Sequence, residues 1–318
     1  MRRQKSSSGS REGRYEGGPT KTHRAPKPQH LGDLKDANHL APGLYVTATP
    51  IGNARDITLR ALDVLHGCDL IAAEDTRVTA KLLAIHGIRK PLTAYNDHNA
   101  ERERPRLLER LRRGGRIALV SDAGTPLVSD PGFKLARAAI EEGLPVHVLP
   151  GASAVLAGLV LSGLPSDRFL FAGFLSSKAG ERRSALEEIK SIGATLIFFE
   201  SGNRLAVSLK DMAEILGARQ AVVARELTKL HEEVRRGDLT ALAQAYEKES
   251  APKGEVTLVV SPPRQAETDF AAVDAALDKA LAFMPLKPAS EMIAALLGLS
   301  RHAVYARGVE KKAEKNNG

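Results

Sequence analysis

The chain has 318 residues, of which 43% are hydrophobic and 4% aromatic, and its formal net charge is +8. This length is enough for two domains, and the absence of Trp argues against a surface that grips bases mainly by aromatic stacking. The single cysteine, Cys68, cannot form an internal disulfide, which favours a cytoplasmic protein in which Cys68 is a small core residue.

The excess basic charge lies at the two ends of the chain. Residues 1–42 contain nine Lys or Arg and four Asp or Glu, residues 301–318 contain five and two, and residues 43–300 sum to zero. Residues 1–42 are also rich in Ser, Gly and Pro, so we expect a disordered basic tail. Such a tail favours binding to a polyanion such as RNA, and it is equally compatible with a solvated tail that binds nothing.

Residues 43–164 alternate between strand and helix patterns. Strands are expected at 43–48, 68–75, 116–120 and 145–151, and helices at 57–67, 76–87, 101–115, 131–143 and 152–163. This alternation predicts an N-terminal α/β domain over 43–164, with a parallel sheet covered on both faces. The apolar stretch 152–164 is too short to span a membrane, and no membrane partner is expected.

A second alternating set covers residues 165–262 and predicts a C-terminal α/β domain with some antiparallel pairing. Residues 231–239 are expected to form a hairpin arm or a loop. Residues 261–269 are predicted to be a linker, and residues 270–312 a helical hairpin appendage with Gly298 ending one helix and Ser300 capping the next. The tight turn resembles a helix-turn-helix, and a hairpin packed on the body explains it equally well.

Three turns with small residues follow predicted strands of the first domain. They are "TATPIGN" (47–53), "SDAGTPLVSDPG" (121–132) and "PGASA" (150–154). None is a GxGxxG or GxxxxGK[ST] sequence, which excludes the two common nucleotide fingerprints. Ligands of parallel sheets bind beyond the carboxyl ends of the strands, and the third turn opens a helix whose N–H groups favour an anion. Together the three turns predict a cofactor site.

Charged residues also follow strand ends. "AAEDTR" contains Glu74, Asp75 and Arg77, and "RELTKLHEE" (225–233) contains Lys229. A carboxylate beside an arginine serves as a general base, a substrate clamp or, most commonly, a structural ion pair. No Cys and His set has metal-ligand spacing, so no metal site is predicted.

At these motifs the chain closely resembles the bacterial ribosomal RNA small subunit methyltransferase I family, which belongs to the tetrapyrrole-methylase superfamily. The resemblance covers about residues 42–260 and is carried by "LYVTATPIGNARDIT", "ALVSDAGTPLVSDPGF", "LPGASA", "RELTKLHEE" and "KGEVTLVV". It implies two α/β domains with S-adenosylmethionine between them, a cytosolic homodimer, and 2′-O-methylation of a cytidine ribose in the decoding region of 16S ribosomal RNA, with the 30S subunit as the expected partner.

Carried over by residue, the resemblance implies that Pro50 faces the cofactor in the first turn. It also implies that Gly124, Thr125 and Val128 bind the cofactor in the second turn and that Ser153 and Ala154 do so in the third. The strand at 254–260 is expected to supply backbone near the adenine. The chain departs from the usual family wording at "SGNR" (201–204) and "YNDHN" (95–99).

A neutral ribose hydroxyl is a poor nucleophile, so a base or a cation is expected to help its proton leave. We assign Glu74 or Asp75 to accept or orient that proton, and Arg77 and Lys229 to steer phosphate or stabilise the developing alkoxide. Two alternatives remain open at this level. One is a methylase of the same fold that acts on a tetrapyrrole or a protein side chain, and the other is a non-catalytic module that binds RNA or the ribosome.

Overall fold

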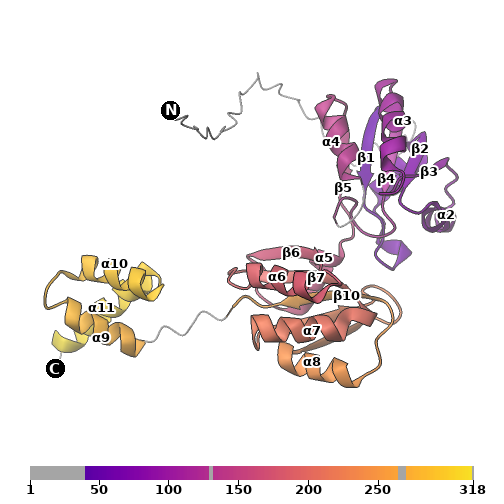
Figure 1. Ribbon diagram of the computed structural model, residues 1–318. Coiled ribbons are helices and arrows are strands. Elements are labelled where there is room, and N and C mark those ends of the chain that lie inside the picture. The colour runs from indigo at the N-terminus through magenta and orange to yellow at the C-terminus, as the bar shows by residue number, and fades with distance from the viewer. Residues whose placement is uncertain (1–39, 129–131, 264–269, 317–318) are drawn as a thin grey trace, which may run out of the picture. The chain divides into compact units, whose positions relative to one another are not determined.

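The computed structural model describes residues 40–128, 132–263 and 270–316 (Figure 1). Most of the predicted basic tail, residues 1–39, lies outside the described residues, as do residues 129–131 of the second turn and 264–269 of the predicted linker. Among the described helices, none is both long and apolar enough to cross a membrane.

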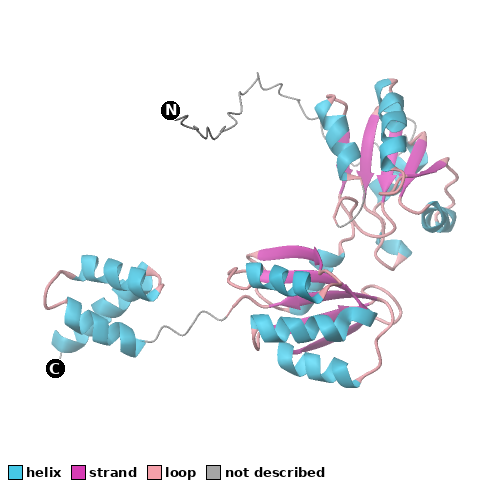
Figure 2. Cartoon of the chain, viewed as in Figure 1, coloured by secondary structure: helices cyan, strands magenta, loops and turns pink. Residues whose placement is uncertain are grey.

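The first sheet is fully parallel, with the strand order β3-β2-β4-β1-β5 (Figure 2). Its strands are β1 (Gly43–Thr47), β2 (Leu70–Ala73), β3 (Leu92–Ala94), β4 (Arg116–Val120) and β5 (Val146–Leu149). The helices between them are η2 (Ala54–Asp56), α1 (Leu59–Gly67), α2 (Thr76–Ile85), α3 (Ala100–Arg112) and α4 (Phe133–Glu141). The α/β class predicted for this region is confirmed.

The alternation of side chains along each strand explains why helices cover both faces of this sheet. On β1, Leu44 and Val46 pack with α3 and α4, whereas Tyr45 packs with α1 and α2. On β4, Ile117 and Leu119 face the first pair of helices, and the residues between them face the second. A strand that is apolar on both faces needs helices on both sides. Cys68 is a free, buried thiol in one of these layers.

The second sheet is mixed, with the order β6-β7-β10-β8-β9. Its strands are β6 (Phe169–Phe174), β7 (Thr195–Ser201), β8 (Gln220–Arg225), β9 (Glu233–Asp238) and β10 (Glu255–Val260). Strands β6 and β7 are parallel, and β10 and β9 pair antiparallel with their neighbours. Residues 231–239 therefore include a hairpin arm. The sheet is covered on one face by α6 (Ala179–Ile189), α7 (Gly202–Leu216) and α8 (Leu239–Lys248).

Helix α5 (Ala154–Ser162) follows β5 but covers the other face of the second sheet. Its Val155 and Leu159 pack with residues of β7, β8 and β10, and Gly158 lies so close to β10 that a Cβ there would be 2.7 Å from Thr257 Cγ2. The domain boundary at residue 164 stays a prediction. Helix α5 precedes this boundary in the chain and yet packs on the second sheet.

Three described helices make up the C-terminal region, of which two lie on either side of Gly298 as expected and one precedes them. They are α9 (Phe270–Ala280), α10 (Leu286–Leu297) and α11 (Arg301–Asn316), and they share one apolar core. Gly298 ends α10 in the left-handed conformation, as the sequence predicts. In addition to the hairpin of α10 and α11, α9 contributes Val273 and Leu277 to that core.

Candidate active site

The three small-residue turns of the first sheet meet at its carboxyl edge. Thr49 and Gly124 form an antiparallel bridge, with N···O distances of 2.8 and 3.0 Å. The Thr125 hydroxyl donates to the Ala152 carbonyl at 3.2 Å. A Cβ on Gly151 would be 2.8 Å from that of Ala48, so this close approach needs glycine. These contacts follow from parallel topology, which brings all strand ends to one edge.

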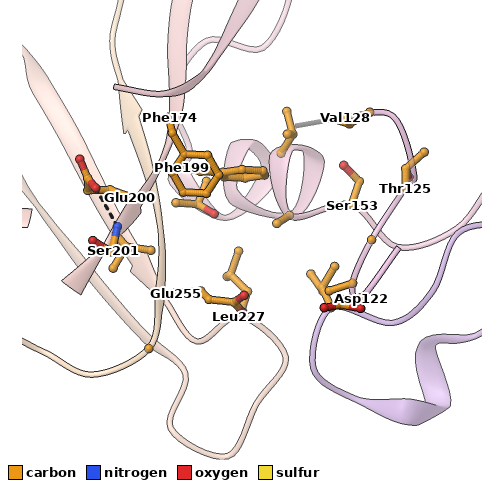
Figure 3. Close-up of a pocket in the computed structure, with 18 of the residues that line it drawn as sticks. Asp122, Thr125, Val128, Ser153, Phe174, Phe199, Glu200, Ser201, Leu227 and Glu255 are labelled. Atoms are coloured by element: carbon orange, nitrogen blue, oxygen red, sulfur yellow. Dashed lines mark hydrogen bonds between the residues drawn. The ribbon is translucent and has the colours of Figure 1, made fainter. Parts of the chain in front are cut away.

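A cavity of about 380 Å³ opens between these turns and the second sheet (Figure 3). This is within the usual size range of small-molecule sites. The described residues that line it are Ile51, Glu74, Asp122, Ala123, Gly124, Thr125, Val128, Ser153, Ala154, Val155, Phe174, Phe199, Glu200, Ser201, Leu227, Gly254, Glu255, Val256 and Thr257. Every charged side chain in this set is a carboxylate.

Two of these carboxylates, Glu74 and Asp122, come from the ends of β2 and β4. The Asp122 N–H donates to Glu74 Oε2 at 3.3 Å, and Asp122 Oδ1 accepts from the Asp75 N–H at 3.0 Å. Burial raises the pKa of Glu74, and the hydrogen bond from Asp122 offsets only part of that rise. Burial also raises the pKa of Asp122. A carboxyl whose pKa is raised in a cavity is a candidate for proton transfer.

Asp75 has a different role from its neighbour Glu74. It is the N-cap of α2, where its carboxylate accepts from the Arg77 N–H at 2.8 Å and forms an ion pair with the Arg77 guanidinium at 2.5 Å. These bonds from Arg77 lower the pKa of Asp75 to about 2. The Arg77 side chain is 87% exposed, and neither residue lines the cavity. Asp75 and Arg77 therefore form an ion pair at the start of α2, outside the cavity lining.

The opposite wall belongs to the second sheet and combines two aromatic rings with polar residues. The Phe174 and Phe199 rings meet edge to face, with centroids 5.6 Å apart, and lie across the cavity from Asp122 and Thr125 (Figure 3). Beside them the buried Glu200 accepts hydrogen bonds from the Ser201 N–H at 2.8 Å and the Ser208 hydroxyl at 2.5 Å, and it pairs with Arg204 at 3.1 Å. The Glu200 carboxylate therefore has its hydrogen-bond partners within the protein, and these bonds hold the end of β7 to α7.

The sequence-predicted residues divide into two groups. Those that line the cavity are Glu74, Gly124, Thr125, Val128, Ser153 and Ala154; those that do not are Pro50, Asp75, Arg77 and Lys229. Pro50 is adjacent to Ile51, which does line it. Lys229 is beside the cavity, where its ammonium contacts Glu226 at 2.9 Å and Glu255 at 2.7 Å.

Sequence reasoning did not single out Asp122, Phe174, Phe199 or Leu227 as site residues. Asp122 carried a signal, since it directly follows a buried strand and opens the second turn. The two phenylalanines carried none, because in sequence they are indistinguishable from the core residues of β6 and β7.

Comparison with known proteins yields two family matches along the chain. A model described as Tetrapyrrole (Corrin/Porphyrin) Methylases matches residues 43–243. A second, described as the RsmI C-terminal HTH domain, matches residues 267–312. The first match covers the first sheet, strands β6 to β9 and most of the cavity lining, and it ends before β10. The second covers α9, α10 and most of α11.

Individual relatives agree with these matches. A ribosomal RNA small subunit methyltransferase I from Mesorhizobium japonicum is 50% identical over 89% of this chain and 96% of its own length. That of Escherichia coli O157:H7 is 46% identical over 85% and 95%. The solved structure of a Thermus thermophilus uroporphyrin-III C-methyltransferase complexed with S-adenosylhomocysteine has a TM-score of 0.50 and 19% identity, covering 69% of this chain and 97% of that one.

Proposed function

Since the chain belongs to the tetrapyrrole-methylase family and, within it, to the ribosomal RNA small subunit methyltransferase I family, we propose that it methylates 16S ribosomal RNA of the small subunit. The methyl donor is S-adenosylmethionine, and the acceptor is the 2′-hydroxyl of a cytidine in the decoding region. The single observation that carries the proposal is the cavity at the carboxyl edge of the first sheet, which has the carboxylates of Glu74 and Asp122 on one wall and the rings of Phe174 and Phe199 on the other.

The cavity fits this cofactor in size and chemistry. Small residues at 123, 124 and 154 leave main chain accessible, and the rings of Phe174 and Phe199 suit the adenine. The first turn of α5 at Ser153–Val155 lines the cavity. Its N–H groups would hold the carboxylate of the methionine moiety. Gly124 and Thr125 would face the same moiety, and Val128 would bound it. Pro50 lies outside the lining and would position its neighbour Ile51, which does line the cavity.

When bound, the cofactor would supply an electrophilic methyl group carried on a sulfonium sulfur, and transfer of that methyl to the ribose oxygen would leave a neutral thioether. The protein's part is alignment of the ribose hydroxyl and removal of its proton. Glu74 is favoured over Asp75 as the proton acceptor because Glu74 lines the cavity with a raised pKa, whereas Asp75 is held ionised by Arg77. The Asp122 N–H, which donates to Glu74 Oε2, favours the ionised carboxylate, whereas the charge of the Asp122 carboxylate favours the protonated form.

The proposed RNA contact is Arg77. Its exposed guanidinium pairs with Asp75, the residue that follows the cavity residue Glu74. At this position the guanidinium would contact a phosphate of the substrate. Lys229, which the sequence suggests for the same task, already contacts two carboxylates, so we assign it no phosphate. The small subunit as a whole is the proposed substrate, because the acidic cavity offers little with which to read an RNA sequence.

A homodimer is also part of the proposal, with the cytoplasm as the place where the enzyme meets small subunits. Leu156 and Val160 lie one turn apart on α5 and are 51% and 79% exposed. Strand β5 is the edge of the first sheet and exposes Val148. Exposed apolar residues on a helix and an adjoining edge strand are typical of an interface. Light scattering of the wild type and of Val160→Glu tests this, with a monomer expected for the variant.

The test of function is transfer of labelled methyl from S-adenosylmethionine to 30S subunits and to free 16S RNA from a strain that lacks the activity, with the modified nucleotide mapped. Label on a decoding-region ribose is expected. Cofactor binding without transfer to either acceptor would favour a tetrapyrrole or protein substrate instead. Salt-sensitive RNA binding without any cofactor binding would favour a non-catalytic ribosome-binding module.

A further inference from the structure

The turn after β8, residues 226–229, contains two residues in backbone conformations that are unfavourable for their residue types. Among the described non-glycine residues, only Leu127, Glu226 and Thr228 have positive φ, at 74°, 51° and 65°. Glu226 and Thr228 flank Leu227, which lines the cavity, and Leu127 adjoins Val128 on the opposite wall. A left-handed conformation is unfavourable for such residues, above all for the β-branched Thr228, and persists only where surrounding contacts impose it.

One set of contacts ties the turn to the start of β10. Glu226 Oε1 accepts from the Glu255 N–H at 3.0 Å, and the Glu226 N–H donates to the Glu255 carbonyl at 3.0 Å. Gly254 has φ +100°, and a Cβ there would lie 2.3 Å from Glu226 Oε1. The carboxylate thus occupies space that only glycine leaves open. Gly254 and Glu255 are themselves cavity residues.

A second set ties the same turn to the first strand-exit turn. The Thr228 hydroxyl accepts from the Asn53 N–H at 3.1 Å. A Cβ on Gly52 would be 2.5 Å from Lys229 Cγ and 2.8 Å from Thr228 Oγ1, so this approach too depends on glycine. Ile51, the next residue back along the chain, lines the cavity and packs with Leu227.

Lys229 completes the arrangement. Its ammonium bridges Glu226 Oε1 and Glu255 Oε2 at 2.9 and 2.7 Å. Burial alone would lower the pKa of Lys229, but its hydrogen bonds with the two carboxylates outweigh burial and raise it. The ammonium is therefore committed to the turn and to β10.

We propose that residues 226–229 form a clasp that sets the spacing of the cofactor cavity by holding Ile51, Leu227 and the start of β10 together. Thr228 and Lys229 are its positioning residues, and Lys229 acts through Glu226 and Glu255 without contacting RNA. The inference rests on the proposed function only for the identity of the cofactor. The strain in the clasp has a purpose under this account, since a relaxed turn would not bring Thr228 Oγ1 to the Asn53 N–H.

The first experiment measures binding of S-adenosylhomocysteine by calorimetry, which does not require turnover or an RNA acceptor. Thr228→Val keeps the side-chain shape and removes the hydrogen-bond acceptor, and we expect it to raise Kd about 3- to 10-fold, as for one lost hydrogen bond. Thr228→Ser restores the hydroxyl and should return Kd to within about 2-fold of wild type. Thr240→Val, at an exposed threonine on α8, is the matched control. An unchanged Kd for folded Thr228→Val would overturn the clasp.

The second experiment separates positioning from RNA contact and stands even if Thr228→Val does not fold. Lys229→Met should raise the KM for S-adenosylmethionine about 3- to 10-fold while the KM for 30S subunits and its salt dependence stay as in wild type. Lys248→Met, at an exposed lysine of α8, is the control. A higher KM for subunits with a shallower salt dependence would instead make Lys229 a phosphate contact. Loss of wild-type methyl transfer would contradict the proposed function alone, because the calorimetry is independent of it.

Discussion

The two walls of the cavity are built by different kinds of sheet, and they carry different chemistry. The parallel first sheet delivers its strand ends to one edge, where they present main-chain turns and the carboxylates Glu74 and Asp122. The mixed second sheet presents the side chains of Phe174 and Phe199, backed by the bonded Glu200. Under the proposed function, the first wall would take the proton from the ribose hydroxyl and the second would mainly provide affinity for the cofactor.

The largest effect should come from the first wall. Glu74→Gln keeps the size of the side chain and removes its basicity, so we expect kcat to fall about 10²- to 10⁴-fold, the usual contribution of a general base. The Kd for S-adenosylhomocysteine should change less than about 3-fold because the cofactor is held by main chain and the two aromatic rings. Single-turnover transfer and calorimetry measure the two quantities.

Two variants serve as controls for that result. Glu188→Gln, on the exposed face of α6, should have no effect. Asp75→Asn removes the cap and the partner of Arg77, and it should reduce turnover far less than Glu74→Gln. A larger loss for Asp75→Asn than for Glu74→Gln would move the proton acceptor to Asp75.

The second wall should respond in the opposite manner. Phe174→Ala removes one of the two rings, and we expect Kd for S-adenosylhomocysteine to rise roughly 10-fold, equivalent to about 1.4 kcal/mol, while kcat at saturating cofactor stays within about 3-fold. Phe169→Ala, on the same strand but outside the cavity lining, is the matched control. A fall in kcat without a change in Kd would break the division between the walls.

The pH dependence sharpens the assignment of Glu74. A base is active when deprotonated, so kcat/KM should rise with pH through the pKa of Glu74, which burial places above its ordinary value of 4.5. Asp122→Asn removes a nearby negative charge that contributes to the rise, so the acidic limb should move to lower pH. If the acidic limb of the kcat/KM profile does not move in Asp122→Asn, the Asp122 charge does not contribute to the raised pKa of Glu74.

The smallest effect concerns stability. Because the folded protein raises the pKa of Glu74, the ionised carboxylate disfavours folding at neutral pH. This penalty shrinks as pH falls through the folded pKa and is gone below the unfolded pKa. Glu74→Gln should therefore increase the free energy of unfolding at pH 7 by about 0.5–1 kcal/mol, a modest gain because the group is only partly buried. Denaturant unfolding at pH 7 measures it, and a loss of stability would show that the carboxylate has a structural role.

Much of the first wall was predictable from sequence. Alternating strands and helices predict a parallel sheet, and parallel strands bring their exits to one edge, so the turns at 49, 124 and 152 had to be neighbours. The choice between Glu74 and Asp75 was not predictable. The two residues are adjacent in sequence, and only the start of α2 decides that Asp75 becomes its N-cap while Glu74 faces the cavity.

The second wall was less accessible to sequence reasoning. Helix α5 is apolar on all sides, so its sequence predicts burial but does not indicate the sheet on which the helix packs. In the structure it packs on the second sheet. Phe174 and Phe199 belong to strands whose pairing depends on the mixed topology of that sheet. The strain at Glu226 and Thr228 also has no sequence signal, because neither is a residue type that favours positive φ.

The most direct test of the central claim is single-turnover transfer of labelled methyl to 30S subunits, at saturating S-adenosylmethionine, by the wild type and by Glu74→Gln. The account predicts that the wild type labels one decoding-region cytidine ribose, and that the variant binds S-adenosylhomocysteine normally but transfers at least 100-fold more slowly. Transfer by Glu74→Gln at the wild-type rate, with label on the same ribose, would contradict the claim that the first wall performs proton transfer.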